Sequence, residues 1–210
     1  AIGTQTGGSV IRPASYCGVV GFKPTFGHLS VAGVKPLSHS LDTLGCFVRS
    51  AEDLRIFRQA IWNVAGEESP DKKFPKIGFC RTPDWEKAGP STQNALEHAR
   101  QTWSSLGVEI IDVQLPEEFS ALGDAHGCIM VYEAGQNLRY ELSHHQSLLS
   151  KRLRSYFEKP IRFEEYQEAL KMTRLCRDRM QEVFDSCDVL LAPSAPDEAP
   201  HGLDYTGDTV

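Results

Sequence analysis

Residues 3–25 of the chain read GTQTGGSVIRPASYCGVVGFKPT, the most informative run of the sequence. Gly7 and Gly8 are adjacent and immediately precede Ser9. Glycine allows a positive φ and lets the backbone approach a bound group closely, because no Cβ stands in the way. Successive N–H groups in such a turn form an anion-binding concavity. The run therefore predicts a serine hydroxyl beside an oxyanion hole.

Other glycine loops fit this run less well, although Gly-Gly-Ser taken alone is also a common flexible turn. No Gly-Lys-Ser/Thr follows the glycines, as a phosphate-binding loop requires, and there is no G-x-G-x-x-G dinucleotide pattern. The nucleophile elbow G-x-S-x-G is not matched, because Val10 and Ile11 follow Ser9. We expect a short helix here, with Ser9 near its N-terminus and Pro13 in its first turns.

The same run carries a family resemblance. TGGS (residues 6–9) followed by R-P-A-S-x-C-G-x-x-G-x-K-P-T (12–25) resembles the signature of the amidase signature family. The resemblance continues through GVKPLS (33–38), SLDTLG (40–45) and VRSAED (48–53), and returns at DVLLAPS (188–194). It implies an α/β fold with a mixed central β-sheet covered by α-helices on both faces, of which this chain is a part. It also implies hydrolysis of a linear carboxamide without cofactor or metal.

The resemblance assigns roles to the loop. Ser9 matches the nucleophile, and the backbone amides of Thr6, Gly7, Gly8 and Ser9 match the oxyanion hole. The family's lysine base and its bridging serine in a cis peptide lie upstream of the signature. The chain starts with Ala1 rather than methionine, and we expect no strand or helix ahead of the loop to hold it. We therefore interpret the chain as an interior piece of a longer enzyme, inactive alone.

A base inside the chain is the alternative, because a serine hydroxyl is a weak nucleophile without a neighbour that takes its proton. Lys23, Lys35, His28 and His39 are candidates, since a serine–histidine arrangement needs only proximity in space. Lys23 is also interpreted more simply as a structural lysine at a strand end.

Arg12 lies three residues after Ser9, whereas many family members carry an arginine two residues after the nucleophile. Its planar guanidinium could hold a substrate carboxylate bidentately. The alternative is a structural arginine that caps a carbonyl or pairs with an acid such as Asp42.

Composition limits the other classes of function. The chain has 210 residues, 40% of them hydrophobic and 24% charged, as in an ordinary globular domain. A net charge of -6 gives no basic surface for direct nucleic-acid binding. No apolar run approaches the ~20 residues of a membrane span. The expected partner is a small-molecule amide, and a homodimer is the default assembly.

The six cysteines contain no C-x-x-C pair, which predicts reduced, buried thiols in a cytoplasmic protein. His144 and His145 are adjacent on an expected helix and would point in different directions, so we expect no metal site there.

We divide the chain, as part of a single amidase domain, into four regions. Residues 1–55 hold the signature and catalytic loop, 56–116 an α/β unit, 117–185 a helical substrate-pocket region, and 186–210 the return to the central sheet. The patterns predict strands at 19–22, 44–48, 76–80, 108–113 and 187–191, the last a central strand. They predict helices at 51–64 and 91–106, a loop at 67–75, and mainly helix over 117–185, broken at Pro160.

Three functions remain in view. An amidase with a Ser9 acyl-enzyme is preferred; the alternatives are a non-catalytic scaffold of the same fold and a glutamine-dependent amidotransferase subunit. Within the helical region, we expect Met130, Tyr132 and Tyr156 to contact the substrate.

Overall fold

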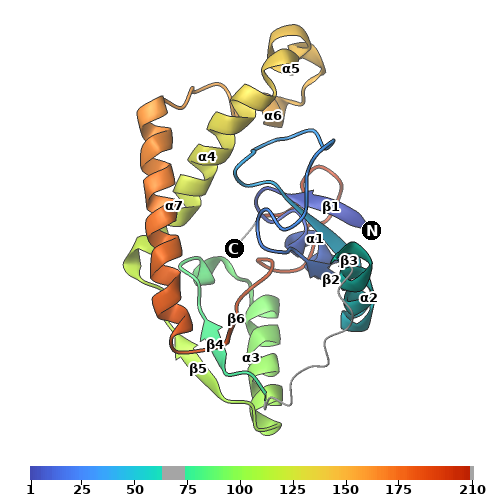
Figure 1. Cartoon of the computed structure of the whole chain (residues 1–210), viewed down its shortest axis with the longest axis vertical. Coiled ribbons are helices and arrows are strands. Elements are labelled where there is room, and N and C mark those ends of the chain that lie inside the picture. The colour runs from blue at the N-terminus through green and yellow to red at the C-terminus, as the bar shows by residue number, and fades with distance from the viewer. Residues whose placement is uncertain (63–73, 209–210) are drawn as a thin grey trace.

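The computed structural model describes residues 1–62 and 74–208. Its strands form two separate three-stranded sheets. In Figure 1 the parallel sheet lies beside the lower end of the long helix α7 (Phe163–Phe184), and the antiparallel sheet lies apart from that helix, to the right. One sheet is antiparallel, in the order β1 (Ile2–Gln5), β3 (Thr43–Val48), β2 (Val20–Phe22). The other is parallel, in the order β5 (Ile110–Val113), β4 (Ile77–Cys80), β6 (Val189–Leu191).

Strand β1 was not expected from the sequence, and the expectation that nothing precedes the serine loop is wrong. Ile2 pairs with Cys46 and Gln5 with Thr43, so β1 runs antiparallel to the middle strand β3. A strand of four residues carries too little local pattern to be recognised, and its partner lies about forty residues away. The serine loop therefore leaves the end of a paired strand.

Helix α1 (Ile11–Tyr16) lies against this sheet, and two glycines allow the close approach. A Cβ at Gly21 would stand 2.6 Å from the Cβ of Ala14. A Cβ at Gly45 would stand 2.6 Å from the carbonyl oxygen of Phe22 and 3.2 Å from the side chain of Val10, which is fully buried. Helix α2 (Ala51–Trp62) follows β3 directly.

The parallel sheet has helices on both faces. The end of α7 packs Val183 against Val113 and the neighbouring Ile111. Asp112 points to the opposite face, because side chains alternate along a strand, and there it binds Arg100 of α3 (Pro90–Ser105). A short 3₁₀ turn, η1 (Trp85–Lys87), precedes α3.

The expected central place of β6 is wrong within the described residues, because β6 pairs with β4 alone. Strand β4 occupies the middle position, and all four of its residues are buried. The apolar run of β6 suggested burial, but Val189 is 41% exposed. The β4–α3–β5 unit has the parallel pairing that its alternation of elements predicts.

The helical region consists of two long antiparallel helices and several short ones. Helix α4 (Leu122–Asn137) packs along α7, and the contact is centred on Ala125, Ile129 and Ala169. The short elements are η2 (Glu117–Ala121), α5 (Arg139–His144), η3 (Gln146–Leu148) and α6 (Lys151–Ser155). The helical prediction for 117–185 is confirmed, and Pro160 lies in the break before α7.

The α/β class and the other strand and helix predictions are confirmed, with end points that differ by one to two residues. Val64 and most of the predicted loop 67–75 lie outside the described residues. No helix in the described ranges is long and apolar enough to cross a membrane.

Candidate active site

Ser9 lies exposed on the loop between β1 and α1. Among residues 1–62 and 74–208, none forms a hydrogen bond with its hydroxyl. The backbone N–H groups of Gly7, Gly8 and Ser9 likewise form no hydrogen bond within the described part of the chain. A hydroxyl beside unused backbone donors can place a carbonyl carbon next to an oxygen nucleophile and its oxygen next to N–H groups.

The expected use of positive φ at Gly7 and Gly8 is wrong, because neither is among the glycines with positive φ. The close neighbour of Gly7 is His126 of α4. A Cβ at Gly7 would lie 3.3 Å from its Cε1 atom, which is tighter than most real contacts. The glycine therefore serves the approach of a side chain from the helical region.

His126 also holds the backbone of the loop. Its Nε2 lies 2.9 Å from the carbonyl oxygen of Thr6. A carbonyl only accepts hydrogen bonds, so Nε2 is the donor and carries the proton. This contact turns the Thr6 carbonyl toward α4.

Gln5 anchors the loop where β1 ends. The residue is buried, and its side-chain oxygen Oε1 accepts hydrogen bonds from the N–H of Val10 at 2.9 Å and of Ile11 at 3.0 Å. These donors lie at the start of α1, whose own N-cap residue Val10 offers no side-chain acceptor. The expectation that Ser9 lies near the N-terminus of a short helix is confirmed, with Pro13 as the third helical residue.

Thr6 is fixed by Asp42. The Thr6 hydroxyl donates to Oδ1 of Asp42 at 2.5 Å, while Oδ2 accepts from the N–H groups of Leu37 and Ser38 at 2.8 and 3.0 Å. Asp42 is 9% exposed. One carboxylate therefore joins the serine loop to the turn of residues 37–42.

That turn is held from its other side by Glu133 of α4. The Glu133 carboxylate is fully buried and accepts from Ser38 Oγ at 2.6 Å, Ser40 N at 3.0 Å, Ser40 Oγ at 2.7 Å and Tyr166 Oη at 2.8 Å. Burial alone would raise the pKa of this carboxyl, but the hydrogen bonds outweigh it and leave the pKa below its ordinary value. Burial and the bond to Glu133 raise the pKa of Tyr166 to about 12.

None of the four candidate bases inside the chain is hydrogen-bonded to Ser9 in the part of the chain that the structure describes. Lys23 donates to the carbonyl of Pro24 at 2.8 Å, and burial lowers the pKa of its ammonium group. It directly follows β2, as expected of a structural lysine at a strand end. Together with His28 it lines a pocket beside α2. Lys35 pairs with Glu141 at 2.9 Å, and His39 lies 3.5 Å from Glu133.

Arg12 does not pair with Asp42, so that part of the structural alternative is wrong. Its Nε atom is buried and has no hydrogen-bond partner in the described residues. Arg12 lies on the first turn of α1, three residues after Ser9, which precedes the helix.

The three residues expected to contact the substrate have separate surroundings in the structure. The ring of Tyr132 stacks on Tyr166 of α7, with the centroids 4.2 Å apart. Tyr156 lies at the end of α6 and is 43% exposed. Met130 is half-buried and follows His126 by one helical turn on α4.

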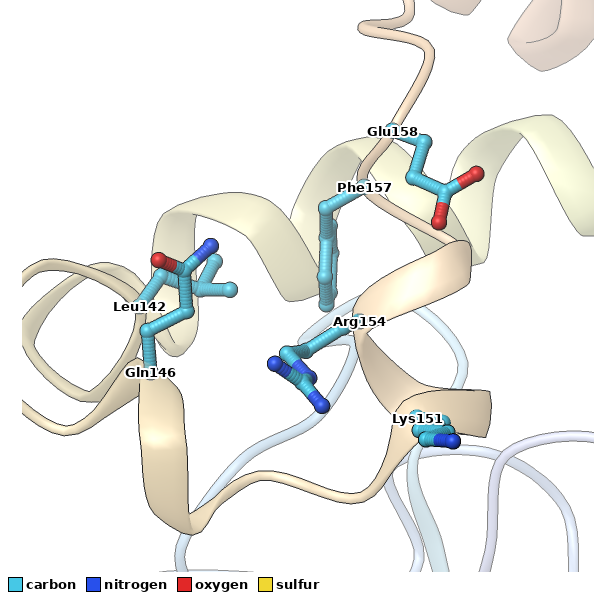
Figure 2. A pocket seen from close by; sticks show the side chains of 6 residues that line it. All are labelled: Leu142, Gln146, Lys151, Arg154, Phe157 and Glu158. Atoms are coloured by element: carbon cyan, nitrogen blue, oxygen red, sulfur yellow. The ribbon is translucent and has the colours of Figure 1, made fainter.

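The helical region contains a pocket of about 370 Å³, but none of those three residues lines it. In Figure 2 Arg154 and Phe157 point toward Leu142 and Gln146, which lie across the space. Lys151 and Glu158 complete the lining, so the pocket carries both charges. Ser9 is not part of it.

All six cysteines are free, but the prediction that all are buried is wrong. Cys17, at the end of α1, is exposed, and Cys128 is half-buried. His144 and His145 are both exposed and contact the ring of Tyr140. In the ranges that the structure describes, no group of three or more metal-ligating side chains gathers.

Sequence reasoning missed Gln5, His126 and Glu133. Glu133 gave a signal that could have been used, because it is the one charged residue in the apolar run from Cys128 to Ala134. Gln5 and His126 gave none, since their partners are backbone groups brought near by the fold.

Comparison with known proteins agrees with this geometry. The family model described as Amidase matches residues 1–208. A glutamyl-tRNA(Gln) amidotransferase subunit from Geotalea daltonii is 31% identical over 239 residues, which is 94% of this chain and 49% of that protein. The corresponding protein from Neisseria gonorrhoeae is 29% identical over 241 residues, with 95% and 50% covered.

A crystal structure of an amidase superposes with a TM-score of 0.88 at 27% identity, covering 97% of this chain and 46% of that one. The chain thus spans about half the length of the curated relatives it matches. Because the family model covers nearly every residue and the structural match extends over the whole fold, the chain belongs to the amidase family.

Proposed function

We propose that Ser9 is the nucleophile of an amidase that cleaves a carboxamide C–N bond through an acyl-enzyme. The observation that carries the proposal is the exposed Ser9 hydroxyl beside backbone N–H groups that no other described residue uses. Asp42, Gln5 and His126 hold this loop from three sides, which supports a preorganised site.

In this mechanism the Ser9 oxygen bonds to the carbonyl carbon while a base takes the hydroxyl proton. The amides of Thr6, Gly7, Gly8 and Ser9 hold the oxyanion that forms. The C–N bond then breaks, the proton passes to the nitrogen, and ammonia or an amine leaves. Water hydrolyses the resulting ester. We place the lysine base and the bridging cis-serine in sequence outside residues 1–210.

A fluorophosphonate probe tests the nucleophile. It should label the full-length protein and fail to label Ser9→Ala, since the probe reacts only with an activated serine. Ser15→Ala is the matched control, because Ser15 is an exposed serine on the adjacent helix α1. Equal labelling of wild type and Ser9→Ala would remove Ser9 as the nucleophile. Equal labelling of the 210-residue chain alone would place the base inside it.

For Arg12 we propose contact with a carboxylate of the substrate, because its buried Nε has no partner in the described residues. A guanidinium that meets a carboxylate contributes two parallel hydrogen bonds. Arg12→Ala should lower kcat/KM for a carboxylated amide more than for a neutral amide of the same size. An unchanged ratio of the two specificity constants would contradict this role.

A glutamine-dependent amidotransferase subunit is the second candidate, favoured by the name that the curated relatives share. Such a subunit needs glutamine as its amide and partner chains that receive the ammonia. Affinity purification of the full-length protein distinguishes the two: stable partners together with glutaminase activity favour the amidotransferase, and a free enzyme active on other amides favours the amidase. A full-length protein with neither activity would favour the non-catalytic scaffold.

A further inference from the structure

Helix α4 presents three polar side chains to the segments around the serine loop. His126 reaches the Thr6 carbonyl at 2.9 Å, Glu133 the Ser38 hydroxyl at 2.6 Å, and Asn137 donates to the Leu37 carbonyl at 3.1 Å. Intervals of seven and four residues place these three on one face of a helix. These three side chains therefore make polar contacts from one face of α4, while Ala125 and Ile129, beside that face, pack against Ala169 of α7.

Glu133 is the most constrained of the three. Its carboxylate is fully buried, and no lysine or arginine of the described residues pairs with it. Serine and tyrosine donors satisfy it instead, and the exposed His39 lies 3.5 Å away. A buried carboxylate without such donors is strongly unfavourable, so the charge orders the turn that supplies them.

Ser38 connects this turn to the serine loop through hydrogen bonds. The Ser38 hydroxyl donates to Glu133, and the Ser38 N–H donates to Asp42. The other oxygen of Asp42 accepts from the Thr6 hydroxyl. Two hydrogen-bonded carboxylates therefore stand between α4 and the first of the oxyanion-loop residues.

We infer that Glu133 is a positioning residue for the oxyanion loop, acting through Ser38 and Asp42 on Thr6. The inference rests on the proposed function, and it assigns to the helical region a part in the chemical step. Because an oxyanion exists only after attack, a displaced loop loses contacts in the transition state and keeps those with the bound amide. Loss of Glu133 should therefore lower kcat and leave KM nearly unchanged.

The test compares Glu133→Gln with Glu118→Gln in the full-length protein. The glutamine side chain has one oxygen, so its NH₂ group meets a donor where Glu133 accepts from Ser40 or Ser38. Glu118 is the control, since its carboxylate pairs with Arg179 of α7 at 3.0 Å and does not contact the turn. We expect Glu133→Gln to lower kcat about 10- to 100-fold with KM within about 3-fold, the range of a small misplacement of reacting groups.

A trifluoromethyl ketone supplies the readout that a purely structural role would not move. This inhibitor forms a tetrahedral oxyanion adduct with a serine, so its Ki should rise in parallel with the loss of kcat. An amide analogue that binds without forming an adduct should keep its affinity. Equal weakening of both ligands, or the same kcat in Glu133→Gln and Glu118→Gln, overturns the inference.

A double-mutant cycle between Glu133 and Asp42 supplies a second measurement. If Glu133 acts through Asp42, the double variant Glu133→Gln/Asp42→Asn should have about the kcat of the poorer single variant, whereas independent effects multiply. Should Glu133→Gln fail to fold, Ser38→Ala removes the hydroxyl through which Glu133 acts and leaves the carboxylate in place. A Ser38→Ala variant with wild-type kcat and wild-type ketone affinity then overturns the inference.

Hydrogen exchange separates this inference from the proposed function. Residues 10–12 supply the amides to follow, because they donate to the Gln5 side chain and to the Gly8 carbonyl. Faster exchange of these amides in Glu133→Gln, with wild-type exchange there in Glu118→Gln, supports the positioning link even in a protein without amidase activity. An inactive, unlabelled wild type contradicts the proposed function alone. Unchanged exchange at residues 10–12 contradicts the positioning link alone.

Discussion

The hydroxyl of Thr6 donates to one oxygen of Asp42 at 2.5 Å while the other oxygen of the same carboxylate accepts two backbone N–H groups of the 37–42 turn. A neutral amide cannot accept at both positions, because one of its two terminal atoms is a donor. The ionised carboxylate is thus the group that can join the serine loop and the turn simultaneously.

Asp42→Asn should therefore reduce activity and stability together. One buried N–H or hydroxyl loses its acceptor, at a cost of about 1–3 kcal/mol in the free energy of unfolding. We expect kcat/KM on an amide to fall about tenfold or more, since the oxyanion loop loses its fixed position. Steady-state kinetics and urea denaturation measure the two effects.

Asp53→Asn is the control for this variant. Asp53 also accepts a backbone N–H, that of Arg49 at 3.3 Å, but this hydrogen bond is exposed to solvent at the start of α2. Its activity should stay at the wild-type level. An Asp42→Asn protein that loses stability and retains full kcat/KM would show that the Thr6 contact has no bearing on the chemistry.

Replacement of Gln5 should destabilise the start of α1. Gln5→Ala leaves the N–H groups of Val10 and Ile11 without their acceptor, and we expect a loss of about 1–3 kcal/mol in unfolding free energy. Gln5→Glu keeps a carbonyl-like acceptor at the same place and should retain most of the stability. Equal losses for both variants, measured by denaturation, would show that packing rather than the hydrogen bonds matters here.

Gly45→Ala should be destabilising because of where its methyl group would point. The new Cβ would stand 2.6 Å from the carbonyl oxygen of Phe22, a distance that the backbone must relieve, at a cost of about 1–3 kcal/mol. Gly123→Ala is the matched change, since no atom lies within 4 Å of a Cβ there and the site is helical. It should raise stability by about 0.5–1 kcal/mol. Thermal unfolding of both proteins measures the two changes in stability. A Gly45→Ala protein as stable as wild type would contradict the close approach of the Phe22 carbonyl to residue 45.

Acid should weaken the protein partly through Glu133. Its pKa in the folded protein lies below the ordinary value, so the unfolded chain takes up the proton first as the pH falls. The stabilisation is complete above the unfolded pKa of about 4.3, and it is lost as the pH falls through the folded pKa. Below about pH 5, unfolding free energy should fall less steeply with decreasing pH in Glu133→Gln than in wild type. Parallel curves from denaturation at several pH values would refute the linkage.

Local patterns predicted most of the helices and strands but not the sheet order. The apolar spacing of Leu54, Phe57 and Ile61 lies within one segment and predicts α2 without reference to the rest of the chain. Strand β1 shows no such pattern, since its structure depends on pairing with residues 43–46. The same holds for β6, whose apolar residues suggested a central strand although only one neighbour pairs with it among the described residues.

The candidate site likewise has one part that the sequence predicts and another that it does not. Ser9 and its glycines are contiguous, so their sequence suffices to suggest the chemistry. Glu133 lies 95 residues from Ser38, and His126 lies 120 residues from Thr6. Which distant side chain meets a loop is decided by the packing of α4 on α7, and no spacing in the chain encodes that choice.

The register of β1 on β3 has a consequence for recombining this family's sequences. Gln5 pairs with Thr43, so the next residues along the two strands, Thr6 and Asp42, face one another. Because a slip of one residue turns every side chain to the other face, a single insertion in either strand would separate them. Residues 2–6 and 42–46 therefore behave as one cassette: a chimaera that takes one strand from a relative should take the other from the same parent.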